Sequence, residues 1–144
     1  MKYVLDTDIL TLLAHEQSQA GAHIRRRMVE LARGDTVATT VVNYEEQIRG
    51  WMALLSRAKS AEAEMFAYGQ LIAHLDMFRT LDVLPYGHAA AELTNNLRSQ
   101  RIRVGTMDLK IAAITLISQA TLITRNVADF GRVPNLQIED WSVE

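Results

Sequence analysis

Short runs of β-branched and apolar residues alternate with longer stretches of helical periodicity along this chain. The run TVATTVV at 36–42 is typical of the first kind, and the residues after Thr7 place their apolar side chains at helical spacing. Such alternation indicates βαβ units, in which helices connect parallel strands. The sequence therefore predicts an α/β fold with a central, mostly parallel sheet of about four to five strands flanked by helices.

Residues that favour helix ends divide the helical stretches. Ser18 is predicted to cap a helix that ends near Gly34, and Thr106 is predicted to cap another. Asn43 is predicted to cap a third helix, with Glu46 at the capping-box position. The predicted strands lie at 2–5, 36–42, 81–85, 120–124 and 136–140, and further helices are predicted after Thr7, from a break at 56–60 to about Arg79, and at 87–100.

Composition limits the kinds of protein that this chain can be. The 144 residues are 49% apolar, which argues against disorder, and we expect one domain over 1–144. The absence of cysteine excludes disulfides and thiolate metal sites. No apolar run is long enough for a membrane and no secretory signal is visible, so we expect a cytoplasmic protein without membrane contact. The net charge of −2 provides no overall basic field for nucleic acid, which local charge or metal would have to hold.

Acidic side chains follow the predicted strands. Asp6 and Asp8 come directly after the first strand, and Glu45 and Glu46 follow the second. Asp108 opens the helix that leads into the fourth strand. Because the carboxyl ends of parallel strands meet at one edge of a sheet, several carboxylates would converge there. Such carboxylates repel one another unless a cation lies among them, and a site with only oxygen ligands suits Mg²⁺ or Mn²⁺.

Helix capping is a second explanation for the same residues. The helix dipole favours negative charge in the first turn of a helix, and Asp8, Glu46 and Asp108 all lie in predicted first turns. Asn126 with Asp129 also fits a local capping arrangement after the fourth strand. From these residues alone, a metal site and helix capping both remain open.

The chain contains, in order, the motifs LDTDIL, VVNYEEQIRG, MDLKIAA and LITRNVADFGRVPNLQIEDW. This ordered series resembles the PIN-domain nucleases and, more closely, the VapC-type toxins of bacterial toxin–antitoxin systems. The resemblance covers nearly the whole chain. It implies a parallel α/β/α sandwich and metal-dependent cleavage of a structured RNA such as tRNA or rRNA.

The resemblance also implies roles for individual residues. Asp6, Glu46 and Asp108 match the catalytic acids of the family, which bind Mg²⁺ or Mn²⁺. Many family members have Asp where this chain has Asn126, so Asn126 and Asp129 are both candidates for the fourth catalytic position. The candidates to hydrogen-bond the acids or the attacking water are Thr7, Asp8 and Thr124.

Partners follow from the same resemblance. The toxins of this family act on RNA, are silenced by a cognate antitoxin protein and are usually homodimers, so we expect the same of this chain. The candidates to contact RNA phosphates are Arg101, Arg103, Lys110 and Arg125, which lie in or beside the acidic motifs.

Two other functions fit parts of the sequence. The DTD at 6–8 is also found at the start of haloacid-dehalogenase phosphatases, although Leu10 stands where that family prefers Thr or Val. A PIN-like binding module that has lost its activity is supported only by Asn126. The four histidines lie outside the acidic motifs, and none is assigned to catalysis.

Overall fold

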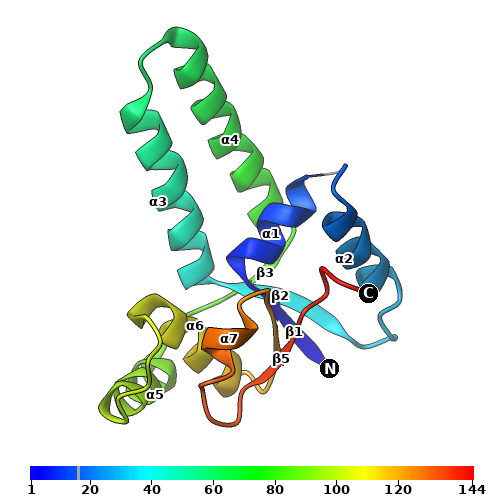
Figure 1. Ribbon diagram of the computed structural model, residues 1–144, viewed down its shortest axis with the longest axis vertical. Coiled ribbons are helices and arrows are strands. Elements are labelled where there is room, and N and C mark those ends of the chain that lie inside the picture. The colour runs from blue at the N-terminus through cyan, green and yellow to red at the C-terminus, as the bar shows by residue number, and fades with distance from the viewer. Residues whose placement is uncertain (16) are drawn as a thin grey trace.

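Five parallel strands form one sheet in the computed structural model of the protein, which describes residues 1–15 and 17–144 (Figure 1). The strands are β1 (Lys2–Leu5), β2 (Thr36–Thr40), β3 (Asp82–Leu84), β4 (Thr121–Ile123) and β5 (Gln137–Glu139). Their order across the sheet is β3-β2-β1-β4-β5, with every neighbouring pair parallel. This sheet confirms the predicted α/β fold, and it places β1 at the centre.

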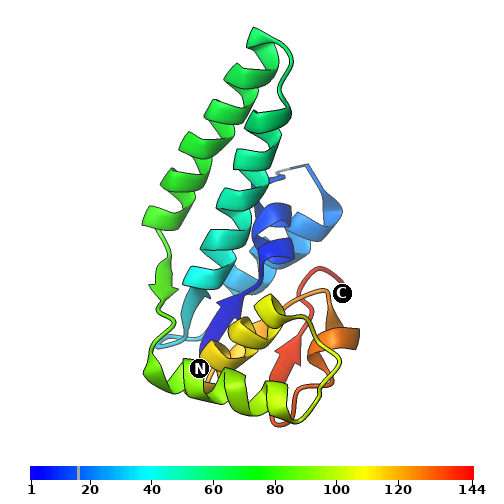
Figure 2. The same cartoon turned by 90° about the vertical axis from the view of Figure 1, so that its left-hand side faces the viewer.

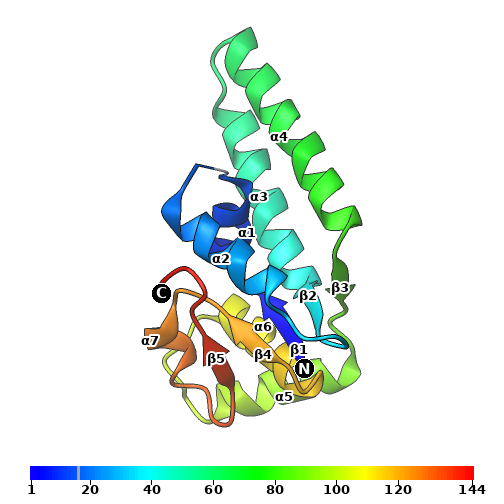
Figure 3. The ribbon, with the colours of Figure 1, turned by 90° about the vertical axis from the view of Figure 1, so that its right-hand side faces the viewer.

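Helices cover both faces of the sheet. They are α1 (Thr7–Ala14), α2 (Gln19–Val29), α3 (Val41–Arg57), α4 (Ala61–Arg79), α5 (His88–Ser99), α6 (Thr106–Ile117) and the short α7 (Val127–Phe130). Figures 2 and 3 show α5 and α6 on one face, and α1 and α2 on the other. The long helices α3 and α4 form an antiparallel pair that extends well beyond the sheet (Figure 1).

Alternate residues of each strand build two separate cores. Successive side chains of a strand point to opposite faces, so Val4 and Leu5 enter different clusters although both are fully buried. Val4 joins the cluster under α5 and α6, together with Leu122. Leu5 joins the cluster under α1 and α2, together with Ile123 and Trp141. Burial of both faces explains why the predicted strands read as short apolar runs.

The helix caps differ from the prediction at three of four positions. Ser18 caps α2 as predicted, because its Oγ accepts a hydrogen bond from the Gly21 backbone N–H at 2.9 Å. That helix ends at Val29 rather than near Gly34, whose φ of +96° places it in the turn before β2. The other two corrections concern the N-caps of α3 and α6, which are Thr40 and Gly105 rather than Asn43 and Thr106.

The break within the long helical region lies where the sequence predicted it. The helix α3 ends at Arg57, and Ser60 caps α4 by accepting a hydrogen bond from the Ala63 backbone N–H at 3.1 Å. Across residues 1–15 and 17–144, none of the helices combines the length and the apolar character needed to cross a bilayer.

Candidate active site

The strand order reverses next to β1. The chain adds β2 and β3 on one side of β1 and later places β4 and β5 on the other. Ligands of parallel sheets bind at such a switch point, beyond the carboxyl ends of the strands. Asp6 follows β1 directly, and Thr124 follows β4 directly, so both residues lie at the switch point.

Asp6 is held at both of its carboxylate oxygens. Its side chain is buried, with 7% of its surface exposed. Asn43 Nδ2 donates a hydrogen bond to Asp6 Oδ1 at 2.9 Å, and Thr124 Oγ1 donates one to Asp6 Oδ2 at 2.8 Å. Burial raises the pKa of Asp6, and these hydrogen bonds oppose the rise because they stabilise the carboxylate.

Glu46 reaches the same region from α3. It is the sixth residue of that helix, so it lies beyond the first turn and is not part of a capping box, which corrects the sequence prediction. Its Oε1 accepts a hydrogen bond from Thr7 Oγ1 at 2.9 Å. Burial raises the pKa of Glu46, and the charges of Asp6 and Asp108 raise it further. The position of Glu46 therefore fits the site rather than the cap.

Asp8 and Asp108 lie in the first turns of α1 and α6, where the helix dipole stabilises negative charge. Even so, burial together with the charge of Asp6 raises the pKa of each to about 6. Asp8 Oδ2 accepts a hydrogen bond from the Arg125 backbone N–H at 3.1 Å. Asp8 Oδ1 is buried and has no hydrogen-bond partner among the described residues, so a polar ligand at this oxygen would be favourable.

Asp6 is the electrostatic centre of the cluster, because its charge raises the pKa of Asp8, Glu46 and Asp108. Within 1–15 and 17–144, no Lys or Arg forms a salt bridge with any of these four acids. Over the same residues, no three acidic or histidine side chains are positioned to bind one metal ion in the arrangement shown. A shared cation would therefore draw these carboxylates closer together, which their mutual repulsion otherwise opposes.

Asn126 and Asp129 are engaged with each other. The side chain of Asn126 caps α7, with its Oδ1 accepting from the Asp129 backbone N–H at 3.4 Å and its Nδ2 donating to Asp129 Oδ2 at 3.1 Å. Arg132 forms a salt bridge with Asp129 at 3.0 Å. The structure thus contains the capping arrangement that was the second explanation for this pair. The charge of Asp129 nevertheless raises the pKa of Asp108, so the pair lies beside the cluster.

The four predicted phosphate contacts lie at different depths. Arg125 is exposed next to Asp8. Its positive charge offsets a small part of the rise in the pKa of Asp8. Arg101 and Arg103 are exposed in the loop before α6, which carries Asp108. Lys110 is half-buried and places its Nζ 5.6 Å from the centre of the Tyr86 ring. Three of the four side chains are therefore exposed.

Asn43 is the residue of this region whose position the sequence analysis missed, because it was read only as a helix cap. It is fully buried, and its side chain contacts both Asp6 and Thr7. A pattern in the sequence could have indicated this position. Residues three apart share a helix face, so Asn43 was bound to point the same way as Glu46.

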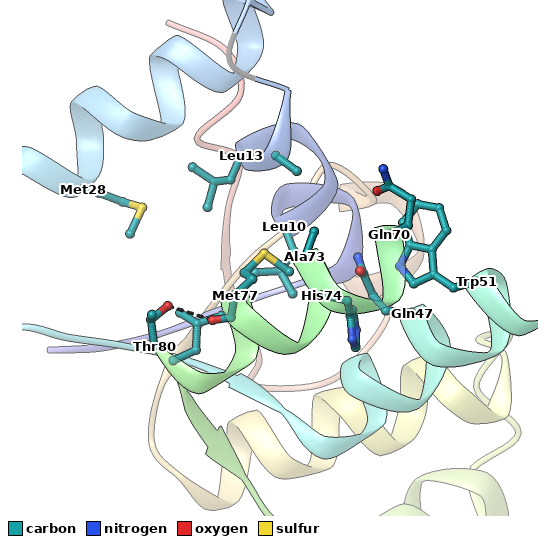
Figure 4. A pocket seen from close by; sticks show the side chains of 12 residues that line it. Leu10, Leu13, Met28, Gln47, Trp51, Gln70, Ala73, His74, Met77 and Thr80 are labelled. Atoms are coloured by element: carbon teal, nitrogen blue, oxygen red, sulfur yellow. Dashed lines mark hydrogen bonds between the residues drawn. The ribbon is translucent and has the colours of Figure 1, made fainter. Parts of the chain in front are cut away.

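Two hollows lie beside α1, and one of them reaches Glu46. A groove of about 290 Å³ lies between α1 and α3, begins at Thr7 and Glu46 and extends past Trp51 to Arg57. A cavity of about 460 Å³ lies among α1, α2, α3 and α4 (Figure 4). The side chains that Figure 4 labels around it are mostly apolar and include Leu10, Leu13, Met28, Trp51 and Met77.

Known proteins resemble this chain over its whole length. Ribonuclease VapC1 of Haemophilus influenzae is 30% identical over 144 residues, which cover 99% of each chain. The chain belongs to the VapC ribonuclease family. The tRNA(fMet)-specific endonuclease VapC of Shigella flexneri is 27% identical over 146 residues, again 99% of each chain. The structure of VapBC-1 from nontypeable H. influenzae superposes with a TM-score of 0.76 at 27% identity, covering 99% of this chain and 100% of the other.

Family membership resolves the choice of enzyme class. No family model matches the chain, so the assignment rests on the relatives and on the fold. The VapC ribonucleases are nucleases, which confirms the predicted activity and is inconsistent with the phosphatase alternative that the DTD motif had suggested. Nucleases of this type are generally metal-dependent.

Proposed function

We propose that the protein cleaves structured RNA by phosphodiester hydrolysis at the cluster formed by Asp6, Glu46 and Asp108. The observation that carries this proposal is the convergence of the three acids at the switch point, where the charge of Asp6 raises the pKa of the other two. Uncompensated repulsion of this kind destabilises a fold. The arrangement therefore supports a site that holds a cation while it works.

The chemistry of the donor atoms in the cluster suits Mg²⁺ or Mn²⁺. Every donor in the cluster is an oxygen, which these hard cations prefer, and Asp8 Oδ1 is a buried acceptor without a hydrogen-bond partner among the described residues. Asp6, Glu46 and Asp108 would hold the ion. When bound, such an ion would polarise the scissile phosphate and lower the pKa of a water molecule. Asn126 and Asp129, already paired with each other, are proposed to border the site rather than to bind the ion.

Neighbouring side chains fix the orientation of the acids before substrate binds. Thr124 and Asn43 hold the two oxygens of Asp6, and Thr7 holds Glu46, so neither acid loses much freedom when substrate arrives. The pKa of Asp108 is raised only to about 6, so its carboxylate is ionised near neutral pH. Arg125 and Lys110 are proposed to attract and orient phosphates next to the acids, offsetting the negative field that the substrate would otherwise meet.

A transfer RNA is the substrate class that the relatives favour. The S. flexneri relative is named for its action on tRNA(fMet), and it aligns with the whole of this chain. Ribosomal RNA is the second class that the resemblance implies. Arg101 and Arg103, exposed in the loop that enters α6, are proposed to contact the backbone of either RNA.

We also propose that a cognate antitoxin covers the site. The H. influenzae structure that superposes on this chain is a VapBC pair. The groove between α1 and α3 ends at Glu46 on one side and is lined by Trp51 and Leu54 further along. It therefore suits a segment with apolar side chains followed by a basic residue. Three further expectations from the sequence stay predictions. Limited proteolysis would test whether the chain is a single domain, and gel filtration would test whether it is a homodimer. Cell fractionation would test whether it is cytoplasmic.

Cleavage of tRNA and rRNA by the purified protein tests the proposed function. Purified antitoxin-free protein would be incubated with pools of bacterial tRNA and rRNA in EDTA, Mg²⁺ or Mn²⁺, beside Asp6→Asn purified in the same way. The proposal predicts discrete cuts that need the metal and disappear in the mutant. Equal cutting by Asp6→Asn would contradict it. No cutting, with no effect of metal on the melting temperature, would support the alternative of an inactive binding module.

A further inference from the structure

The side chain of Asn43 connects the acid that follows β1 with the acid on α3. It has no exposed surface, and it lies at the third residue of α3. We propose that Asn43 is a positioning residue, which fixes the separation and the orientation of Asp6 and Glu46. This inference rests on the proposed function only for its effect on cleavage, since the hydrogen bonds that carry it are features of the protein alone.

Thr40 determines which way the carboxamide of Asn43 points. The hydroxyl oxygen of Thr40 accepts hydrogen bonds from the backbone N–H groups of Val42 at 3.2 Å and Asn43 at 3.1 Å. Its single proton is donated to Asn43 Oδ1 at 2.7 Å. A hydroxyl that donates requires an acceptor, so the oxygen of the carboxamide must face Thr40 and its nitrogen must face the acids.

The nitrogen of the carboxamide is hydrogen-bonded to Asp6 directly and is linked to Glu46 through Thr7. Nδ2 donates to Asp6 Oδ1 at 2.9 Å and to Thr7 Oγ1 at 3.0 Å, which uses both of its protons. Thr7 can accept because its own proton is donated to Glu46 Oε1 at 2.9 Å. One chain of hydrogen bonds therefore runs from the N-cap of α3 through Asn43 to Asp6 and, by way of Thr7, to Glu46.

This chain leaves both acids able to bind a further ligand. A carboxylate oxygen can accept more than one hydrogen bond or ligand, and Asp6 Oδ1 receives one from Asn43. A neutral donor at this place holds Asp6 without adding charge to a cluster that is already repulsive. An aspartate in its place would have the same shape, but it would meet Asp6 with an oxygen instead of an N–H group.

Variants of Asn43 and Thr40 separate positioning from simple stabilisation. Asn43→Asp keeps the shape, replaces the N–H donor with an oxygen and adds a negative charge. Thr40→Val removes the hydroxyl that orients Asn43, whereas Thr40→Ser keeps it and should restore function. Thr94→Val is the matched control, because Thr94 is buried and donates to the Ala90 carbonyl at 2.8 Å within α5, which carries none of the four acids.

The experiment measures kcat and KM for RNA cleavage, Mn²⁺ affinity by calorimetry and the melting temperature of each protein. Loss of a group that orients metal ligands typically lowers affinity or activity by about 10–100-fold, and we expect a loss of this size for Asn43→Asp and Thr40→Val, in kcat more than in KM. Thr40→Ser should lie near the wild type. Thr94→Val should lose stability but keep its kcat and Mn²⁺ affinity.

The inference would be overturned if Asn43→Asp and Thr40→Val bound Mn²⁺ and cleaved RNA as Thr94→Val does at a similar melting temperature. It would also be overturned if Thr40→Ser were as impaired as Thr40→Val. Should Asn43→Asp fail to fold, the pair of Thr40 variants decides the matter. If the wild type cleaved no RNA, the proposed function would fail, and the Mn²⁺ affinities would still test the inference.

Discussion

Two polar side chains are buried at the helix α3, and their burial is compensated in different ways. On one side Asn43 has no exposed surface, and both its carboxamide nitrogen and its oxygen have hydrogen-bond partners. On the other side Tyr44 packs against His74 of α4, which is 3% exposed. Neither ring nitrogen of His74 has a hydrogen-bond partner among residues 1–15 and 17–144. In Figure 4 this ring extends from α4 toward α3.

The difference lies in what compensates the burial. At the acids, specific donors from Asn43, Thr124 and Thr7 stabilise charged groups, as a site that must keep carboxylates ionised requires. At His74, ring packing compensates instead, with ring centroids 5.2 Å from Tyr44 and 4.4 Å from Phe78. Burial lowers the pKa of His74, so the ring is held neutral. The acidic cluster is therefore built to hold charged side chains, whereas the surroundings of His74 disfavour the charged form of its ring.

The largest effect expected is on catalysis. Asp6→Asn removes the charge at the centre of the cluster and should lower kcat/KM by at least about a hundred-fold, the upper end of what loss of a ligand-orienting group produces. Because the mutation also removes repulsion toward Asp8, Glu46 and Asp108, the melting temperature in EDTA should stay the same or rise. Kinetics and calorimetry on one preparation would check both results. A clear loss of stability in EDTA would mean that the acids do not repel one another.

Metal should stabilise the wild type through the same cluster. Ligand at a hundred times its dissociation constant stabilises a protein by about 2.7 kcal/mol, which raises the melting temperature of a chain of this size by several degrees. Asp6→Asn and Asp108→Asn should show a smaller rise in Mg²⁺ or Mn²⁺, whereas His74→Phe should show the wild-type rise. Differential scanning fluorimetry over a metal titration is sufficient. An equal rise in all four proteins would place the metal elsewhere.

The two regions should also respond to pH with opposite signs. Asp8 and Asp108 have a pKa raised to about 6 from an ordinary value of 3.8, so the folded protein binds more protons than the unfolded chain between these values. Their contribution to stability is therefore present below about pH 4 and is lost as the pH rises through 6. Comparison of Asp108→Asn with the wild type in EDTA, by urea unfolding at pH 5 and pH 7, should show a relative gain for the mutant at pH 7. A larger gain in the free energy of unfolding of Asp108→Asn, relative to the wild type, at pH 5 than at pH 7 would contradict the raised pKa.

The smallest effect concerns His74. Because the pKa of His74 is lowered in the folded protein, the unfolded chain binds more protons at acidic pH. The contribution of His74 to the stability of the fold is therefore present at neutral pH and is lost as the pH falls below the ordinary pKa of histidine. His74→Phe keeps the ring packing and removes two buried polar atoms, so its free energy of unfolding should rise by about 1 kcal/mol at neutral pH, and more at pH 5. RNA cleavage should not change. Urea unfolding at both pH values is the measurement, and destabilisation at pH 5 would show that the ring has a partner.

The sequence predicted that Asp6 and Glu46 lie at the same edge of the sheet because the order of strands and helices largely determines it. Once the runs at 2–5, 36–42 and 120–124 were assigned to parallel strands, Asp6 and Glu46 had to meet at one edge. The caps were harder to predict because Thr40 and Asn43 are both residues that favour N-caps, and only the end of β2 at Thr40 decides between them. That difference of three residues turned Asn43 from a cap into a buried partner of Asp6.

Long-range packing determined the rest. No catalytic role is predicted for His74, and the sequence near it does not predict its contact with Tyr44, because Tyr44 lies on a different helix. The pairing of Asn126 with Asp129 is local, within four consecutive positions, and the capping alternative anticipated it.

The location of bound Mn²⁺ would show whether Asp6, Glu46 and Asp108 form the metal site. Crystals grown or soaked with Mn²⁺ would be measured for anomalous scattering, with Asp6→Asn crystals as the control. We predict a peak bound by Asp6 and flanked by Glu46 and Asp108, and no such peak in the mutant. A peak held by other residues, or one that persists in Asp6→Asn, would contradict it.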